Sequence, residues 1–218
     1  MSSSGLCLQD LVLSLRGQTL IELNVNVAPG EVLSVMGPSG SGKSTLLAAI
    51  IGALPTGFHL QGRILLAGQD ITGLPTNRRR IGILFQDAVL FAHLSVADNL
   101  GFGLHPSVQP RAKRREVIMA ALERAGLADF AHRDPATLSG GQKTRVALLR
   151  TLLAEPKALL LDEPFSRLDA TLRAQIRSYV LDEARRLGLP VVLVTHDAED
   201  AAAAGGRVIT LNPLQSGP

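Results

Sequence analysis

The stretch GPSGSGKS, residues 37–44, constrains the fold more than any other part of the chain. It matches the pattern G-x-x-x-x-G-K-[ST], follows the apolar run EVLSVM and opens a run with helical periodicity. Glycines let the backbone wrap closely around phosphate oxygens, while Lys43 supplies a positive charge and Ser44 a hydroxyl ligand for Mg²⁺. We therefore expect a strand, a phosphate-binding loop and a helix in that order, and a nucleoside triphosphate bound at the loop.

Short apolar runs alternate with helical patterns along most of the chain. The apolar runs lie at 31–36, 81–85, 158–162 and 191–195. Their composition and length are typical of buried parallel strands. Helical periodicity is clearest at 43–54, before Pro55, and at 172–188, ending at Gly188. This alternation predicts an α/β fold with a parallel sheet.

Two regions depart from that alternation. The runs at 6–15 and 19–27 alternate apolar and polar residues, which is typical of antiparallel strands. Residues 88–137 have mostly helical patterns, the clearest at 115–127. We expect a single domain over 1–218. Its nucleotide-binding core and antiparallel β layer comprise 1–86 and 138–218, and its inserted helical lobe comprises 88–137.

Composition favours a folded cytoplasmic protein. The chain is 46% hydrophobic and 19% charged, and its apolar runs are shorter than the roughly 18–20 residues of a membrane span. Its first ten residues lack the pattern of a signal peptide, and a single cysteine, Cys7, allows no internal disulfide. The net charge is +3. The basic runs at 78–80 and 111–115 fit a strand edge and the solvated start of a helix, respectively, better than a nucleic-acid surface. We expect no nucleic-acid partner.

Polar residues follow three of the predicted strands. Asp162 and Glu163 end the run ALLLDE, at the edge where open parallel sheets bind ligands. Asp162 is placed to hold Mg²⁺ and Glu163 to polarise the attacking water, although alone the pair also fits a solvated acidic turn. Gln86 and His196 end two other strands, and each is either an ordinary polar residue at a strand end or a functional one. In the functional alternative, the glutamine reaches Mg²⁺ and water, and the histidine donates a hydrogen bond to a γ-phosphate oxygen.

A second glycine-rich motif, LSGGQ at 138–142, lies at the predicted start of a helix. Backbone N–H groups at a helix N-terminus attract anions, so this motif is a second candidate phosphate cradle. The motif lies far along the chain from Lys43, so the residues alone leave its ligand open.

Taken in order, the phosphate loop, Gln86, LSGGQ, LLLDEP, SRLD and THD resemble the ATP-binding subunits of ABC transporters. The resemblance covers nearly the whole chain. It implies an ATPase that uses ATP and Mg²⁺, with Glu163, His196 and Gln86 as catalytic residues and Ser44, Gln86 and Asp162 at the metal. It implies phosphate contacts from Gly37, Pro38, Ser39, Gly40, Ser41, Gly42, Lys43, Ser44 and Thr45.

The same resemblance implies how the second cradle is used. In the family, two subunits pack head to tail, and the signature loop of one covers the ATP held by the other. The residues expected to act across that interface are Ser139, Gly140, Gly141 and Gln142, with Asp169 also at the interface. The other implied partners are integral membrane permease subunits and, through them, an extracytoplasmic binding protein. The subunit is then peripheral on the inner face of the cell membrane.

The segment 88–104 and the block 135–173 are similar to compact importer subunits of the thiamine or oxyanion type. An exporter-type subunit and a soluble ABC ATPase of cofactor assembly, repair or translation remain alternatives. Two positions depart from the family pattern. Leu15 stands where an aromatic ring usually covers the base, and the usual S-A-L-D reads Ser166-Arg167-Leu168-Asp169, so that Arg167 adds a charge beside the subunit interface.

Overall fold

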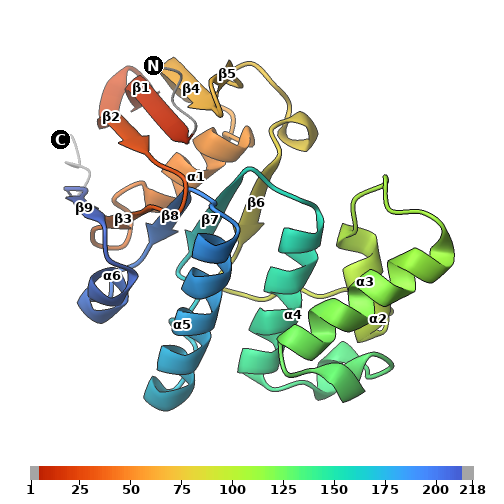
Figure 1. Cartoon of the computed structure of the whole chain (residues 1–218). Coiled ribbons are helices and arrows are strands. Elements are labelled where there is room, and N and C mark those ends of the chain that lie inside the picture. The colour runs from red at the N-terminus through yellow and green to blue at the C-terminus, as the bar shows by residue number, and fades with distance from the viewer. Residues whose placement is uncertain (1–4, 213–218) are drawn as a thin grey trace. The chain divides into compact units, whose positions relative to one another are not determined.

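A computed structural model of the chain describes residues 5–212, which form two compact units (Figure 1). The first unit comprises the residues up to Ile83, then 157–163, then those from Leu181 onward. The second comprises 84–156 and 164–180. The sequence-based division into a core and an inserted lobe at 88–137 stays a prediction. The second unit is larger than that lobe, because it also contains the helix that begins within LSGGQ.

An antiparallel sheet forms the N-terminal layer of the first unit, as the alternating pattern predicts. Its strand order is β2-β1-β4-β5, with bounds β1 (Leu6–Leu15), β2 (Gln18–Val27), β4 (Phe58–Leu66) and β5 (Gln69–Asp70). Alternate residues of β1, among them Leu11 and Leu13, are fully buried on one face. The period-two pattern of the sequence therefore assigns one face of the sheet to the core.

A second sheet of the first unit collects the apolar runs. Its strand order is β6-β7-β8-β3-β9, with bounds β3 (Val32–Met36), β6 (Ile81–Leu84), β7 (Ala158–Asp162), β8 (Val191–Val194) and β9 (Arg207–Thr210). Strand β3 pairs in parallel with β8 and β9, and β7 pairs in parallel with β8. All four residues of β8 are buried, as the continuous apolar composition predicts for a central parallel strand.

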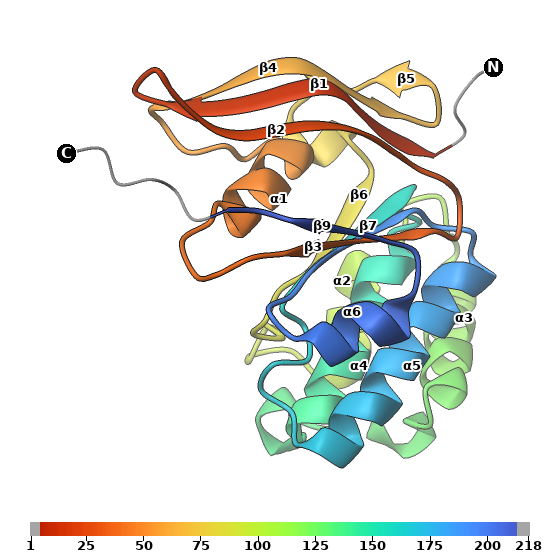
Figure 2. The ribbon, with the colours of Figure 1, turned by 90° about the vertical axis from the view of Figure 1, so that its left-hand side faces the viewer.

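Helix α1 (Lys43–Ile51) lies between the two sheets (Figure 2). Its Leu46, Leu47 and Ile50 are buried in one hydrophobic cluster with residues of both sheets. Burying a leucine or isoleucine side chain contributes about 1.5–3 kcal/mol. The helix therefore joins the two sheets and fixes the direction in which the loop before it points. A second helix of this unit, α6 (Ala198–Ala204), follows β8.

The predicted helix over 43–54 ends earlier, at Ile51. Gly52 adopts the left-handed conformation (φ 80°) that terminates many helices. The guanidinium of Arg79 donates to the carbonyl oxygens of Ala49 (2.9 Å) and Ile50 (2.8 Å), and also to those of Thr72 and Leu74. A buried arginine thus caps the C-terminus of α1, and its position could not be read from the local pattern around Pro55.

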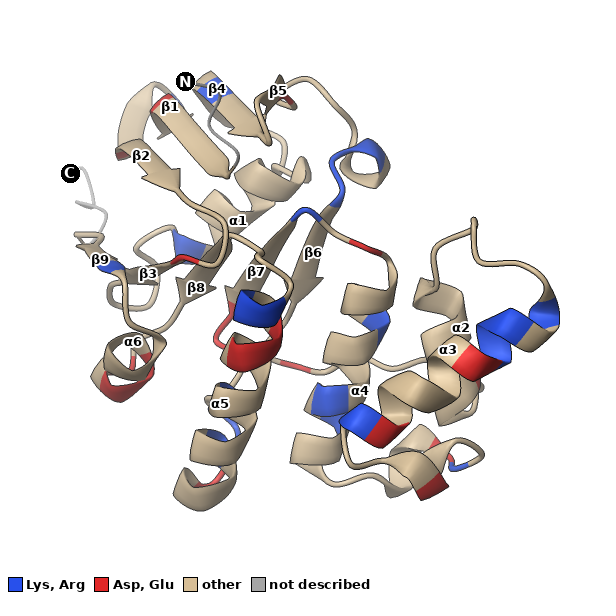
Figure 3. Ribbon diagram, viewed as in Figure 1, with Lys and Arg blue, Asp and Glu red and all other residues tan. Residues whose placement is uncertain are grey.

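The two basic runs differ in the structure. Arg79 is only 5% exposed, and burial lowers the pKa of its guanidinium. The run at 78–80 directly precedes β6, where a strand edge was expected, and its middle arginine is buried. The run at 111–115 does form the start of a largely exposed helix, α3 (Arg111–Arg124), where Figure 3 colours the ribbon at several positions as Lys or Arg.

The second unit is built from helices around their own core. Its helices are α2 (Val96–Gly103), α3 (Arg111–Arg124), α4 (Gly140–Leu153) and the first part of α5 (Ala170–Arg186), with short 3-10 turns at Ala128–Phe130 and Pro135–Thr137. Its core includes Leu100, Leu122 and Val146, all fully buried. Residues 88–95, expected within a mostly helical region, form a loop before α2.

Replacing Arg79 by methionine is predicted to lower the free energy of unfolding by about 2–4 kcal/mol. The change keeps much of the side-chain volume but leaves buried carbonyl groups at the end of α1 without donors, each costing about 1–3 kcal/mol. The measurement is a urea unfolding curve, with Arg78→Met as the matched control, because Arg78 is exposed on the same turn. Equal effects of the two substitutions would contradict the capping role.

Candidate active site

The predicted phosphate loop lies between β3 and α1. Three of its glycines have φ values of 153°, 81° and 89°, a region that other residues rarely adopt, at Gly37, Gly40 and Gly42. A Cβ on Gly37 would lie 2.8 Å from the carbonyl oxygen of Leu211, whereas a Cβ on Gly40 would meet open space. The loop is therefore packed tightly on its protein side and open on the other side, as a backbone cradle for phosphate requires.

Lys43 is directed into this loop. Its Nζ donates to the carbonyl oxygens of Gly37 (2.8 Å) and Pro38 (2.9 Å), and the residue is only 7% exposed. A cavity of about 220 Å³ adjoins it, lined by Ser39, Gly40, Gly42, Lys43, Ser44, Thr45 and Glu163. The loop residues and the predicted catalytic carboxylate thus share one cavity of the first unit.

Asp162 lies beside the loop, at the end of β7. The hydroxyl of Ser44 donates to Asp162 Oδ1 over 3.4 Å. Burial raises the pKa of the Asp162 carboxyl, and the negative charge of Glu163 raises it further. Ionising Asp162 therefore costs more free energy in the folded protein than in water, and a cation bound at this oxygen offsets that cost.

Mg²⁺ fits this donor set. Two ligands of one Mg²⁺ at right angles lie about 3 Å apart, because each is about 2.1 Å from the ion, and the oxygens of Ser44 and Asp162 are close to that spacing. Within residues 5–212, no cluster of three or more histidine, cysteine or acidic residues forms a metal site of protein ligands alone. Such a pair suits a cation whose remaining ligands are water and phosphate.

Glu163 and His196 meet at the ends of neighbouring strands. Asp162 is paired with Val194, and the backbone N–H of Glu163 donates to the carbonyl oxygen of Val194 (2.9 Å). The parallel register thus puts Glu163 beside the residues that follow β8. There, His196 Nδ1 lies 3.0 Å from Glu163 Oε2. Glu163 also has φ 45°, a strained value for a non-glycine residue and one found at functional positions.

Two residues that support His196 were missed from the sequence. The Thr195 hydroxyl oxygen accepts from the backbone N–H of Asp197 (3.0 Å), and the hydroxyl donates to the carboxylate of Asp200 (3.4 Å), which is 2% exposed. Asp197 in turn caps α6. These contacts hold the short turn that carries His196. In the sequence, these supporting residues are indicated only by the run Thr-His-Asp that follows an apolar strand.

Gln86 and Asp169 belong to the second unit. Gln86 Nε2 donates to the hydroxyl oxygen of Ser166 over 3.0 Å. Asp169 begins α5, since its carboxylate accepts from the backbone N–H of Leu172 (3.0 Å). Next to these residues, the guanidinium of Arg167 forms an ion pair with the carboxylate of Asp87.

The LSGGQ motif forms the N-terminus of α4, as predicted. Ser139 and Gln142 form a capping box: the Ser139 hydroxyl oxygen accepts from the Gln142 backbone N–H, and Gln142 Oε1 accepts from the Ser139 N–H. A Cβ on Gly141 would lie 2.8 Å from a methyl group of Leu172, so a larger residue there would require the Leu172 side chain to move. Gly140 is exposed at the helix start. The predicted site residues therefore form two groups, one in each unit.

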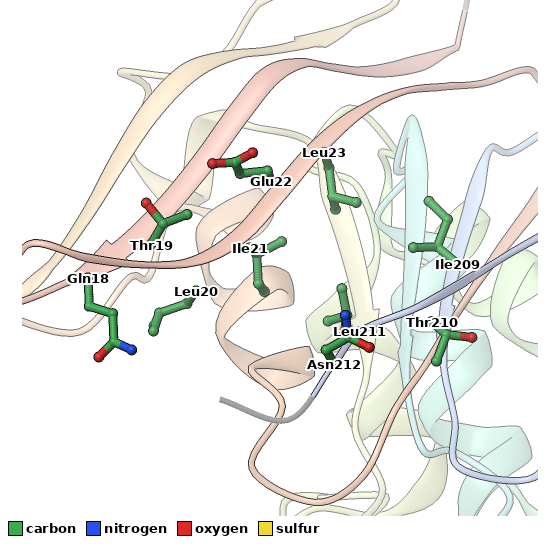
Figure 4. Close-up of a pocket in the computed structure, with 10 residues that line it drawn as sticks. All are labelled: Gln18, Thr19, Leu20, Ile21, Glu22, Leu23, Ile209, Thr210, Leu211 and Asn212. Carbon is green, nitrogen blue, oxygen red and sulfur yellow. The ribbon is translucent and has the colours of Figure 1, made fainter. Parts of the chain in front are cut away.

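A groove of about 330 Å³ lies in the first unit between β2 and β9 (Figure 4). It is lined by Gln18, Thr19, Leu20, Ile21, Glu22, Leu23, Ile209, Thr210, Leu211 and Asn212, none of which is a predicted site residue. Glu22 is the one carboxylate among them. This groove is thus separate from the chemistry at the strand ends.

Leu15, where the family pattern has an aromatic ring, ends β1 directly opposite Phe58 of β4. The sequence around Leu15 does not indicate this neighbour, because Phe58 lies on another strand and is distant in sequence. Leu15 and Phe58 point to the same face of the sheet, as directly opposed residues do.

A family model described as "ABC transporter" matches residues 20–166. The chain is 52% identical over 199 residues to the "Uncharacterized ABC transporter ATP-binding protein YnjD" of Escherichia coli K12, a match that covers 91% of each chain. The chain belongs to the ABC transporter family. It is an ATP-binding subunit and an ATPase of that family.

Other relatives of this ABC ATPase are named for import. It is 43% identical over 190 residues to the "Fe(3+) ions import ATP-binding protein FbpC" of Agrobacterium fabrum, covering 87% of this chain and 53% of the relative. It thus spans about half the length of that importer subunit. Its structure matches cbiO1 of Clostridium perfringens, described as part of the ABC transporter complex cbiONQ, with a TM-score of 0.83, 31% identity and coverage of 96% and 85%. That neighbour confirms the predicted α/β fold class. No helix within 5–212 is long and apolar enough to cross a membrane.

Proposed function

We propose that this ABC ATPase energises import through separate membrane subunits, as a head-to-tail homodimer on the inner face of the membrane. The import assignment rests on relatives that are named for iron(III) import and for spermidine and putrescine import. The observation that carries the catalytic part is the Glu163–His196 contact at the ends of adjacent strands, in the unit that holds the phosphate loop.

In the proposed site, the loop amides and Lys43 bind the phosphates of ATP, and Ser44 and Asp162 hold Mg²⁺. When bound there, Mg²⁺ neutralises negative charge on the phosphate oxygens. Lys43 already donates to carbonyl oxygens of the loop, so its charge is directed at the centre of the cradle before ligand binds. A preset charge lowers the reorganisation cost of the reaction.

Glu163 acts on water in this proposal. Its carboxylate orients a water molecule and accepts a proton from it as the oxygen attacks the γ-phosphate. His196 Nδ1 lies 3.0 Å from Glu163 Oε2, and in this proposal it donates to that oxygen and fixes the orientation of the carboxylate toward the water. Thr195 and Asp200 hold the turn that presents the histidine.

Replacing Glu163 by glutamine is predicted to lower the rate of ATP hydrolysis at least a hundredfold, while the dissociation constant for ATP changes less than threefold. The amide keeps the shape of the side chain but accepts no proton, and general bases of this kind contribute about 10²–10⁴-fold. Single-turnover hydrolysis and equilibrium binding of ATP measure the two quantities. Near-normal hydrolysis would remove Glu163 from the catalytic role.

The docking loop, residues 89–94, is the proposed contact for a membrane subunit. The Asn99 side chain, fully buried, donates to the carbonyl oxygens of Phe91 and Leu94 and accepts from the Phe91 N–H (2.8 Å). Arg150 donates to the carbonyl oxygen of Val89 (2.7 Å), and its guanidinium lies 5.1 Å from the centre of the Phe91 ring. These bonds hold the loop in one conformation without a partner.

The docking loop and α2 together present apolar side chains. Val89 of the loop is 63% exposed, and Phe102 of α2, which contacts the Phe91 ring edge-to-face, is 71% exposed. By contrast, Val96 is buried completely and Leu90 packs partly against the core of the unit. An apolar groove of about 250 Å³ adjoins the loop, lined by Ala88, Val89, Leu90, Ala92, Pro135, Ala136 and Lys143. We infer that a short apolar helix of a membrane subunit occupies it.

Val89→Glu and Phe102→Glu are predicted to abolish copurification of the subunit with its membrane partners, since each puts a charge on an apolar contact surface. Both variants should fold and bind ATP, because both side chains are exposed. The matched control is Val208→Glu, an exposed valine on β9. Intact assembly of both the Val89 and the Phe102 variant in a detergent pull-down would place docking elsewhere.

A further inference from the structure

Two adjacent side-chain contacts join segments that lie 80 positions apart in the second unit. The Gln86 amide nitrogen donates to the Ser166 hydroxyl oxygen, and the Arg167 guanidinium pairs with the Asp87 carboxylate. The contacts are parallel, since residues 86 and 87 face residues 166 and 167 in order. Arg167 is the residue that departs from the family pattern S-A-L-D.

The segment that carries Ser166 and Arg167 is firmly anchored. Phe165 is fully buried, and Leu168 is 9% exposed and donates from its backbone N–H to the Phe165 carbonyl oxygen (3.1 Å). Asp169 begins α5 directly afterwards, and Arg173 donates to the carbonyl oxygen of Ser166. The two side chains therefore project from a turn that packing holds in place.

The segment that carries Gln86 has fewer supports of its own. Strand β6 ends at Leu84, and the next three residues are exposed, with Phe85 at 51%. A glutamine amide has a nitrogen end and an oxygen end, and only the oxygen binds a hard cation. A donor contact from Nε2 to Ser166 therefore decides which way the oxygen points.

We propose that Ser166 and Arg167 are positioning residues for Gln86. Ser166 fixes the amide so that Oε1 faces away from the turn, and Arg167 holds the backbone at Asp87 through the ion pair. This inference rests on the proposed ATPase function and on the role that the family resemblance implies for Gln86, as a ligand of the Mg²⁺ that accompanies ATP. Because both side chains of the ion pair are about 60% exposed, its contribution is small and falls with salt.

The test measures how much Mg²⁺ tightens ATP binding, as the ratio of the dissociation constants in EDTA and in Mg²⁺. A Glu163→Gln background prevents turnover. Gln86→Ala should lower this ratio, and Ser166→Ala and Arg167→Ala should each lower it about two- to fivefold, as expected for one exposed contact. Ser166→Thr, which keeps the hydroxyl, should restore the ratio. Lys113→Ala, which breaks another exposed ion pair, should leave it unchanged.

A second readout needs no metal or nucleotide. The side-chain amide signals of Gln86, assigned by NMR from their loss in Gln86→Ala, should shift in Ser166→Ala and keep their position in Lys113→Ala. A hydrogen-bonded amide proton differs in chemical shift from a solvated one. Unchanged signals would show that the hydroxyl does not hold the amide.

The outcomes separate this inference from the proposed function. If Gln86→Ala leaves the ratio unchanged, the proposed metal role of Gln86 fails. If Gln86→Ala lowers the ratio but the Ser166 and Arg167 variants do not, only the positioning role fails. A higher ratio in Arg167→Ala would also overturn it, because the contacts would then hold Gln86 away from the metal.

Discussion

The site depends on the parallel pairing of β7 with β8 and of β8 with β3. Parallel strands end at the same edge of a sheet, so the residues that follow them are brought together. Here they are the phosphate loop after β3, Asp162 and Glu163 at the end of β7, and His196 after β8. A shift of β7 against β8 would separate Glu163 from His196, because the Glu163 N–H is bonded to Val194. The apolar side chains that fix this register are thus as necessary to the chemistry as the polar ones.

Much of this arrangement could be predicted from the sequence. The phosphate loop has a specific spacing, and a continuous apolar run that ends in Asp-Glu or Thr-His indicates both a buried strand and the edge at which it ends. The structure confirms the strands, and their parallel register brings Glu163 and His196 together. Each of these inferences needs only a short window of residues.

The features that were not predicted involve contacts between residues that are far apart in the sequence. Helix α1 ends where Arg79 caps it from nearly thirty positions away, and Phe58 faces Leu15 across two strands. The Asp87–Arg167 pair joins segments 80 positions apart. Exposure also follows from packing rather than from residue type: Val89 and Val96 are both valines of the segment 88–104, yet one is 63% exposed and the other is fully buried.

The capping box at Ser139 is compatible with a phosphate contact across a dimer. Its hydroxyl oxygen accepts from Gln142, which leaves the hydroxyl proton free to be donated. The proposed dimer is tested most directly by mixing Ser139→Arg subunits with Lys43→Ala subunits. Each variant alone should be inactive. An equal mixture should regain about a quarter of the wild-type ATPase rate, since half of the dimers are mixed and each has one intact composite site. An inactive mixture in which mixed dimers are demonstrated by tag pull-down would contradict the account.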